Sequence, residues 1–209
     1  MDHEEVGRYW DRNAEVWTQL VRAGSDHYRD GLNTLAFFEM LPDVDGPSGL
    51  DVGCGEGHNT RLLAERGARM TGIDISERFV RHAREAEVMR PLGIGYKLAS
   101  AVDLPFGEAS FDFATAFMSL MEIPETECVL AEVFRVLKTG GFFQFSITHP
   151  CFDTPHRKNL HDETGYTYAI EVGDYFDRRE RSKSGSSSLL PRRSAKDYRL
   201  SAPPFSCAP

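Results

Sequence analysis

The segment from Gly49 to Thr60, GLDVGCGEGHNT, places glycines at alternate positions, and an isolated aspartate follows in MTGIDIS at 70–76. Glycine accepts positive φ and has no Cβ, so a ligand can lie against the main chain at Gly53, Gly55 and Gly57. The N–H groups that open the helix expected next would face the same ligand. A carboxylate at the end of the following strand, Asp74, can accept hydrogen bonds from both hydroxyls of a ribose. This combination predicts a site for an adenosyl group.

The charge around the loop distinguishes two adenosyl ligands. A dinucleotide places an anionic pyrophosphate at the helix N-terminus, where acidic neighbours are unfavourable. Here Asp51 lies at the end of the strand and Glu56 between the second and third glycines. The third glycine also follows the second by two residues, rather than by the three of the dinucleotide fingerprint. These features favour S-adenosylmethionine, which carries a sulfonium and an ammonium group, over a nicotinamide dinucleotide.

The apolar pattern around the loop predicts strands that alternate with helices. Strands are expected at 49–52, 68–73, 96–98, 110–117 and 142–148, and helices at 59–66, 77–90 and 125–137, the last stopped by Gly140 and Gly141. This alternation predicts an α/β fold, a doubly wound, mostly parallel Rossmann-like sheet with helices on both faces. Such sheets bind ligands beyond the carboxyl ends of their strands, where the glycine loop lies.

The ends of the chain differ from this central part. Trp10, Ala14, Trp17 and Val21 recur at helical spacing, and a second helix is expected at 28–40. We therefore predict an N-terminal helical lid at 1–45, with Trp10, Trp17 and Tyr28 over the site or simply packed, and a cofactor-binding domain at 46–180. A further strand is expected at 166–172. The tail at 181–209 is basic and rich in Ser and Pro, and we do not expect it to join the sheet.

Composition limits the class of protein. The chain has 209 residues and a formal net charge of −8. Because the tail holds six basic residues and one acidic residue, the remainder is at −13, which argues against a nucleic-acid partner. No apolar run reaches the roughly 18 residues of a membrane span. The polar N-terminus and the four scattered cysteines predict a reduced, cytoplasmic protein with free thiols.

Four motifs, LDVGCGEG, GIDIS, DLPFGEASFDFATAF and EVFRVLKTGGFF, resemble the successive motifs of class I S-adenosylmethionine-dependent methyltransferases. The resemblance covers about 49–148 and is closest to the group that acts on small molecules and quinone precursors. It implies S-adenosyl-L-methionine as cofactor and a small-molecule acceptor.

The same resemblance implies roles for individual residues. Asp51, Gly53, Gly55 and Gly57 would surround the methionine part, Asp74 would hold the ribose, and Ile75 would pack on the adenine. The adenine edge would meet Ser100, Ala101 and Val102, and the sulfonium side would be closed by Ala116, Phe117 and Met118. Cys54 and Ser76 lie within these motifs and complete the predicted cofactor set.

The chemistry itself needs few side chains, because the methyl group of a sulfonium is already activated. His149, just past the fifth strand, is the candidate base for an acceptor that must lose a proton; the alternative is a capping or packing residue. Cys151 as a nucleophile is disfavoured, because the second Pro-Cys motif of the RNA cytosine-5 enzymes is lacking. His149, Cys151, Asp153, His156 and His161 match no zinc pattern, so we predict no metal.

The C-terminus leaves two questions open. The family's sheet ends with an antiparallel pair of strands, which the tail does not resemble, so these strands can be missing. A non-catalytic S-adenosylmethionine-binding protein is therefore the second hypothesis, ahead of a nicotinamide-dependent oxidoreductase. The sheet edge beside 142–148 would then be open, which would allow a homodimer by edge pairing.

Overall fold

The computed structural model describes residues 2–149, 154 and 156–174. These residues divide into two compact units after Ile147. The first unit contains a five-stranded parallel sheet in the order β3-β2-β1-β4-β5. Its strands are β1 (Ser48–Val52), β2 (Arg69–Asp74), β3 (Gly95–Leu98), β4 (Phe111–Phe117) and β5 (Leu137–Ser146). The predicted doubly wound α/β fold is confirmed.

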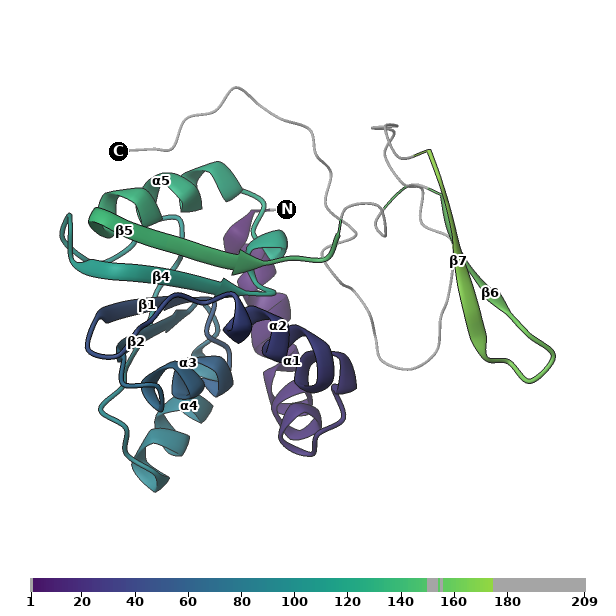
Figure 1. Cartoon of the computed structure of the whole chain (residues 1–209), viewed down its shortest axis with the longest axis horizontal. Helices are drawn as coiled ribbons and strands as arrows, with labels where there is room; N and C mark the ends of the chain where they lie inside the picture. The colour runs from purple at the N-terminus through teal and green to yellow at the C-terminus, as the bar shows by residue number, and fades with distance from the viewer. Residues whose placement is uncertain (1, 150–153, 155, 175–209) are drawn as a thin grey trace. The chain divides into compact units, whose positions relative to one another are not determined.

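Helices cover both faces of this sheet (Figure 1). Each face has its own hydrophobic core. On one face lies α5 (Thr126–Val136), and on the other lie α3 (His58–Ala64) and α4 (Glu77–Met89). Alternate residues of one strand point to opposite faces. In β4, Ala114 accordingly joins the core under α5, whereas Phe113 joins the core under α3 and α4. All strands run parallel, so their carboxyl ends meet at one edge of the sheet.

The N-terminal helices differ slightly from the prediction. The first is α1 (His3–Arg22), which Asp2 caps by accepting a hydrogen bond from the Glu5 N–H. The single helix expected at 28–40 is instead a π-helix, η1 (Arg29–Asn33), followed by α2 (Thr34–Glu39). Gly31 within η1 is a weak helix former, which favours a local departure from α geometry.

The expectation that Gly140 and Gly141 stop the last helix is wrong. α5 ends at Val136 and β5 begins at the next residue, so both glycines lie inside the strand. Gly140 has φ +82°, and a Cβ on Gly141 would lie 2.7 Å from the carbonyl oxygen of Asp112. The pairing with β4 shifts register between Phe111 and Phe113. The glycines therefore permit an irregular strand to approach β4 closely.

The second unit contains an antiparallel hairpin of β6 (His156–His161) and β7 (Thr167–Gly173). β7 confirms the strand expected at 166–172. β6 was not predicted, because HRKNLH contains one apolar residue and acquires its strand form by pairing. Asp162 closes the hairpin by accepting hydrogen bonds from the N–H groups of Thr164 and Tyr166.

Several expectations fall on residues outside the described ranges, namely Cys151, Asp153 and the tail at 181–209. The predicted boundaries at residues 45 and 180 stay predictions. Among the described residues, none of the helices is long and apolar enough to cross a membrane. Cys54 is a buried free thiol, whereas Cys128 is disulfide-bonded, so the expectation of free thiols is wrong for Cys128.

Candidate functional site

The glycine loop between β1 and α3 has three left-handed glycines with different surroundings. Gly53, Gly55 and Gly57 have φ values of +72°, +57° and +88°. A Cβ on Gly53 would lie 2.5 Å from the Cβ of Ser119, and one on Gly57 would lie 2.6 Å from the Tyr96 hydroxyl. A Cβ on Gly55 would meet no atom of the described chain within 4 Å. Protein side chains therefore fill the space beside Gly53 and Gly57, whereas the space beside Gly55 is open to a ligand.

Asp74, at the end of β2, lies beside this open glycine. Its Oδ2 accepts a hydrogen bond from the Gly55 N–H at 2.9 Å, and its Oδ1 accepts one from the Ser76 N–H at 2.9 Å. The residue is 8% exposed. Burial raises the pKa of its carboxyl to about 6, and the hydrogen bonds from Ser76 and Gly55 oppose that shift. The structure thus brings together the carboxylate and the glycine that the sequence assigned to one ligand.

Asp51, at the end of β1, is buried beneath the loop. Its Oδ2 accepts a hydrogen bond from Thr60 Oγ1 at 2.6 Å, and its Oδ1 accepts one from Thr115 Oγ1 at 3.0 Å. Burial raises the pKa of Asp51, and the two hydroxyls oppose the shift. An ionised carboxylate has about four acceptor positions, so two remain beyond these bonds. Sequence reasoning missed both threonines, although Thr115 is the register partner of Asp51 across β1 and β4.

The loop also holds Glu56 and Cys54. Glu56 is 8% exposed, and its Oε2 accepts a hydrogen bond from Arg22 Nε of α1 at 3.1 Å. Cys54 packs its side chain into the core under α3 and α4. Burial, then the charge of Asp74, raises the pKa of the Cys54 thiol well above its ordinary value. Cys54 is therefore held as a neutral thiol, and only its main chain is available to line the loop.

The remaining predicted cofactor residues follow the ends of neighbouring strands. Ile75 and Ser76 follow β2, and Ser76 is fully buried as the N-cap of α4. Ser100, Ala101 and Val102 lie just past β3, whose last residue, Leu98, is paired with Asp74. Ala116 and Phe117 end β4, followed by Met118. All of these stretches lie at the carboxyl edge of the parallel sheet.

The end of β4 is bent by an uncommon backbone conformation. Met118 has φ +52°, and its N–H donates to the carbonyl oxygen of Ser146 at 3.0 Å. A methionine in the left-handed region is uncommon and is held there by its surroundings. Next to it, the ring of Phe117 packs edge-on against Phe37 of α2, with centroids 5.1 Å apart. The α2 helix therefore reaches the end of β4.

The N-terminal aromatic residues have separate positions. Trp10 packs against Trp17, with ring centroids 5.9 Å apart, and against Phe79 of α4 at 6.3 Å. Tyr28 is 79% exposed. Packing of α1 on α4 thus accounts for Trp10, and the lid at 1–45 stays a prediction.

His149 belongs to the second unit, where it is exposed. The cofactor residues all belong to the first unit, and the catalytic role of His149 stays a prediction. The described residues contain no group of three or more His, Cys, Asp and Glu side chains that could hold a metal ion.

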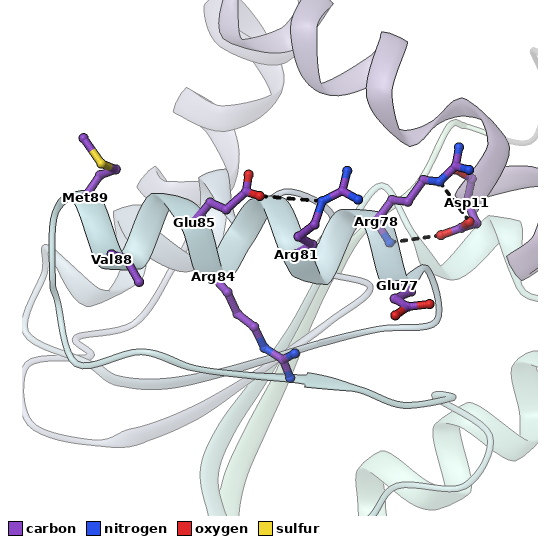
Figure 2. Close-up of a pocket in the computed structure, with 8 residues that line it drawn as sticks. All are labelled: Asp11, Glu77, Arg78, Arg81, Arg84, Glu85, Val88 and Met89. Carbon is purple, nitrogen blue, oxygen red and sulfur yellow. Dashed lines mark hydrogen bonds and ion pairs between the residues drawn. The ribbon is translucent and has the colours of Figure 1, made fainter.

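A pocket of about 740 Å³ lies elsewhere, along the outer side of α4 (Figure 2). Its three arginines already have partners. Arg78 contacts Asp11, Arg81 pairs with Glu85 at 3.6 Å, and Arg84 donates to the carbonyl oxygen of Tyr96 at 2.8 Å. Because these cations are engaged, and the glycine loop and Asp74 do not line it, this pocket is not the cofactor site.

Comparison with known proteins identifies the family. Residues 50–145 match the model of a methyltransferase domain. The chain is 40% identical over 139 residues to a demethylmenaquinone methyltransferase of Tropheryma whipplei, covering 66% of this chain and 56% of that protein. It is 40% identical over 121 residues to an O-methyltransferase of Penicillium expansum, covering 55% and 44%.

A solved structure agrees with these relatives. The crystal structure of an S-adenosylmethionine-dependent methyltransferase from Mesorhizobium loti aligns with a TM-score of 0.59 and 31% identity, covering 68% of this chain and 64% of that one. The domain at 50–145 belongs to the class I S-adenosylmethionine-dependent methyltransferase family, whose cofactor is S-adenosyl-L-methionine. The chain spans about half the length of the curated relatives it matches.

Proposed function

We propose that this protein is an S-adenosylmethionine-dependent methyltransferase that acts on a small molecule. The observation that carries the proposal is the hydrogen bond between Asp74 and the main chain of Gly55, beside an open, left-handed glycine. In the proposal, the Asp74 carboxylate accepts hydrogen bonds from the ribose hydroxyls, next to the point where a ligand can approach the loop. The family of the domain supports the same conclusion.

The charge of the loop fits this cofactor. Asp51, Glu56 and Asp74 are all below a tenth exposed, and Arg22 is the cation that contacts Glu56. Buried carboxylates favour a ligand with positive charge. A pyrophosphate at the same loop would meet the carboxylates of Asp51 and Glu56, which argues against a nicotinamide dinucleotide.

The proposed chemistry is positioning rather than activation. When bound, S-adenosylmethionine supplies a methyl group on a sulfonium, which an acceptor atom attacks in line. In the proposal, Asp74 binds the ribose and the main chain from Gly53 to Gly57 binds the methionine part. Ile75 and Ala101 would contact the adenine, and Met118 would limit the space on the sulfonium side. His149 would take a proton from the acceptor where one must be lost.

A small acceptor is proposed from the charge of the chain and from its relatives. The formal charge of −13 on residues 1–180 disfavours nucleic acid. The relative from Tropheryma whipplei is a demethylmenaquinone methyltransferase, which acts on a quinone precursor. We propose an uncharged or cationic small molecule of this general kind.

A labelled-methyl assay tests the enzymatic activity. The purified chain is incubated with S-adenosylmethionine labelled in the methyl group and a metabolite extract, and label is followed into extractable products. Transfer by the wild type and its loss in Asp74→Ala support the proposal. A second candidate is a binding protein of the same fold without catalysis. Tight cofactor binding without transfer to any extract would support that candidate.

Location and assembly are further parts of the proposal. We propose a cytoplasmic location, and the Cys128 disulfide is the observation against it, because such bonds are rare in reducing compartments. Cell fractionation tests it.

We also propose a homodimer through β5, which within the described residues pairs with β4 alone and exposes Phe145, with Ile147 also exposed just past its end. Sedimentation of a charged variant, Phe145→Lys, should show a monomer.

A further inference from the structure

The helix α1 contacts the ribose-binding segment through one carboxylate. Asp11 Oδ1 accepts hydrogen bonds from Ser76 Oγ at 2.8 Å and from the Arg78 N–H at 3.0 Å. Figure 2 shows Asp11 beside the first turn of α4, with its contacts to Arg78 dashed. Asp11 lies 65 residues before Ser76 in the chain. The contact is therefore tertiary, between an N-terminal helix and the start of α4.

Ser76 connects Asp11 to Asp74 through two hydrogen bonds. Its hydroxyl donates to Asp11 and accepts a hydrogen bond from the Phe79 N–H at 3.2 Å. Both roles of the hydroxyl are thus fixed, and with them the rotamer of a fully buried side chain. The N–H of the same residue donates to Asp74 Oδ1 at 2.9 Å. A displacement of Ser76 would therefore turn the Asp74 carboxylate away from its place beside Gly55.

Close packing of α1 against Ile75 holds Asp11 in position beside Ser76. A Cβ on Gly7 would lie 2.9 Å from Cγ1 of Ile75, so the helix backbone rests on the residue between Asp74 and Ser76. One turn further along, Asp11 reaches Ser76. Together these contacts place α1 against Ile75 and Ser76, the two residues that follow Asp74.

We propose that Asp11 is a positioning residue for cofactor binding: through Ser76 it holds Asp74 in the orientation that receives the ribose. The inference rests on the proposed cofactor role of Asp74. In this relay Asp11 acts as a hydrogen-bond acceptor, and its longer contact with Arg78 Nε, at 3.5 Å, is secondary. Affinity for the cofactor therefore depends on an N-terminal helix that precedes the methyltransferase domain.

Glu15 provides a matched control on the same helix. Its carboxylate also joins α1 to α4, through Arg81 and through His82 Nε2 at 2.9 Å, yet it has no contact with Ser76. Removal of Glu15 weakens the docking of α1 in the same way and leaves the relay intact. A role of Asp11 in docking alone would make the two alanine variants equivalent.

The experiment measures binding of S-adenosylhomocysteine by calorimetry, with thermal unfolding of each ligand-free variant as a check of folding. Asp11→Ala should bind about tenfold more weakly than the wild type, because a charge-assisted hydrogen bond behind Asp74 is lost. Asp11→Asn keeps an acceptor oxygen and should stay within about threefold of the wild type. Glu15→Ala should stay within about twofold, because its contacts are with Arg81 and His82 rather than with Ser76.

The outcomes separate this inference from the assignment of the cofactor. Wild-type protein that fails to bind S-adenosylhomocysteine would overturn the cofactor site itself. Wild-type binding with equal affinity in Asp11→Ala would overturn the relay alone. Equal losses in Asp11→Ala and Glu15→Ala, or in Asp11→Ala and Asp11→Asn, would also overturn it, because docking or the ion pair would then explain the effect.

Discussion

The main-chain N–H of Gly55 donates to Oδ2 of Asp74 at 2.9 Å and links the glycine loop to the end of the neighbouring strand. The bond joins residues 19 apart in the chain. It forms because β1 and β2 are parallel neighbours, so that their carboxyl ends open onto the same edge. At this edge the buried carboxylate of Asp74 lies next to Gly55, which has free space on its Cβ side.

Substitution of Asp74 should remove cofactor binding without unfolding the protein. Hydrogen bonds to charged groups contribute about 1.5–3 kcal/mol each, so Asp74→Ala should weaken affinity for S-adenosylmethionine at least about tenfold. Calorimetry gives the dissociation constant, and circular dichroism reports the fold. Glu85→Ala, at the exposed outer side of α4, serves as the control. Unchanged affinity in Asp74→Ala would reject the ribose assignment.

The raised pKa of Asp74 predicts how stability depends on pH. With a pKa of about 6 in the folded protein and an ordinary value of 3.8, the folded state binds a proton that the unfolded state has lost across this window. The contribution of Asp74 to the free energy of unfolding therefore falls by about 2 kcal/mol as pH rises from 4 to 6, and by about 3 kcal/mol over the whole titration. The penalty becomes constant only well above the folded-state pKa.

Comparison with Asp74→Asn isolates this contribution, because Asp51 also has a raised pKa and titrates in both proteins. The stability of Asp74→Asn relative to the wild type should increase from pH 4 to pH 7. Urea denaturation at several pH values measures the difference. A difference that stays flat across this range would show that Asp74 has an ordinary pKa.

The three loop glycines should respond differently to alanine. Gly55→Ala adds a Cβ in open space and bears mainly the strain of positive φ, about 1–2 kcal/mol, so the protein should fold while cofactor binding is lost. Gly53→Ala and Gly57→Ala also force overlap with Ser119 and Tyr96, and should destabilise the fold more strongly. Thermal unfolding and calorimetry on all three variants distinguish these results. Equal destabilisation in all three would contradict the assignment of Gly55 as the ligand-facing position.

Most helices and strands of the first unit were predictable, because their apolar residues repeat with a clear local period. The loop glycines and Asp74 were predictable for a related reason, since the motif itself encodes a strand, a turn and a helix. Asp11, Thr60 and Thr115 were not, because each forms its hydrogen bond with a residue of a different helix or strand, which only the fold brings close. The prediction that Gly140 and Gly141 end the last helix was wrong, because glycine is common after helices but here lies inside an irregular strand.

His149 should affect turnover more than cofactor binding. The prediction follows from its position after β5, the strand whose end faces the acceptor in the proposed function. His149→Ala should lower the rate of methyl transfer and leave the calorimetric affinity for S-adenosylmethionine unchanged. Exposed His156, on the β6 strand, offers the matched histidine-to-alanine control. Normal turnover of His149→Ala across pH, once an acceptor is known, would reject its role as a base.

Two buried threonines should respond in opposite ways to valine, which has nearly the same shape. Thr115 is 1% exposed and donates to Asp51, so Thr115→Val leaves a buried carboxylate short of a donor and should lower the free energy of unfolding by about 1–3 kcal/mol. Thr18 is 2% exposed, and its hydroxyl has no partner among the residues that the structure describes. Thr18→Val removes that unpaired polar group and should be neutral or stabilising. Urea denaturation of both variants measures the contrast. Equal losses would show that the hydroxyl of Thr115 contributes nothing to holding Asp51 beneath the glycine loop.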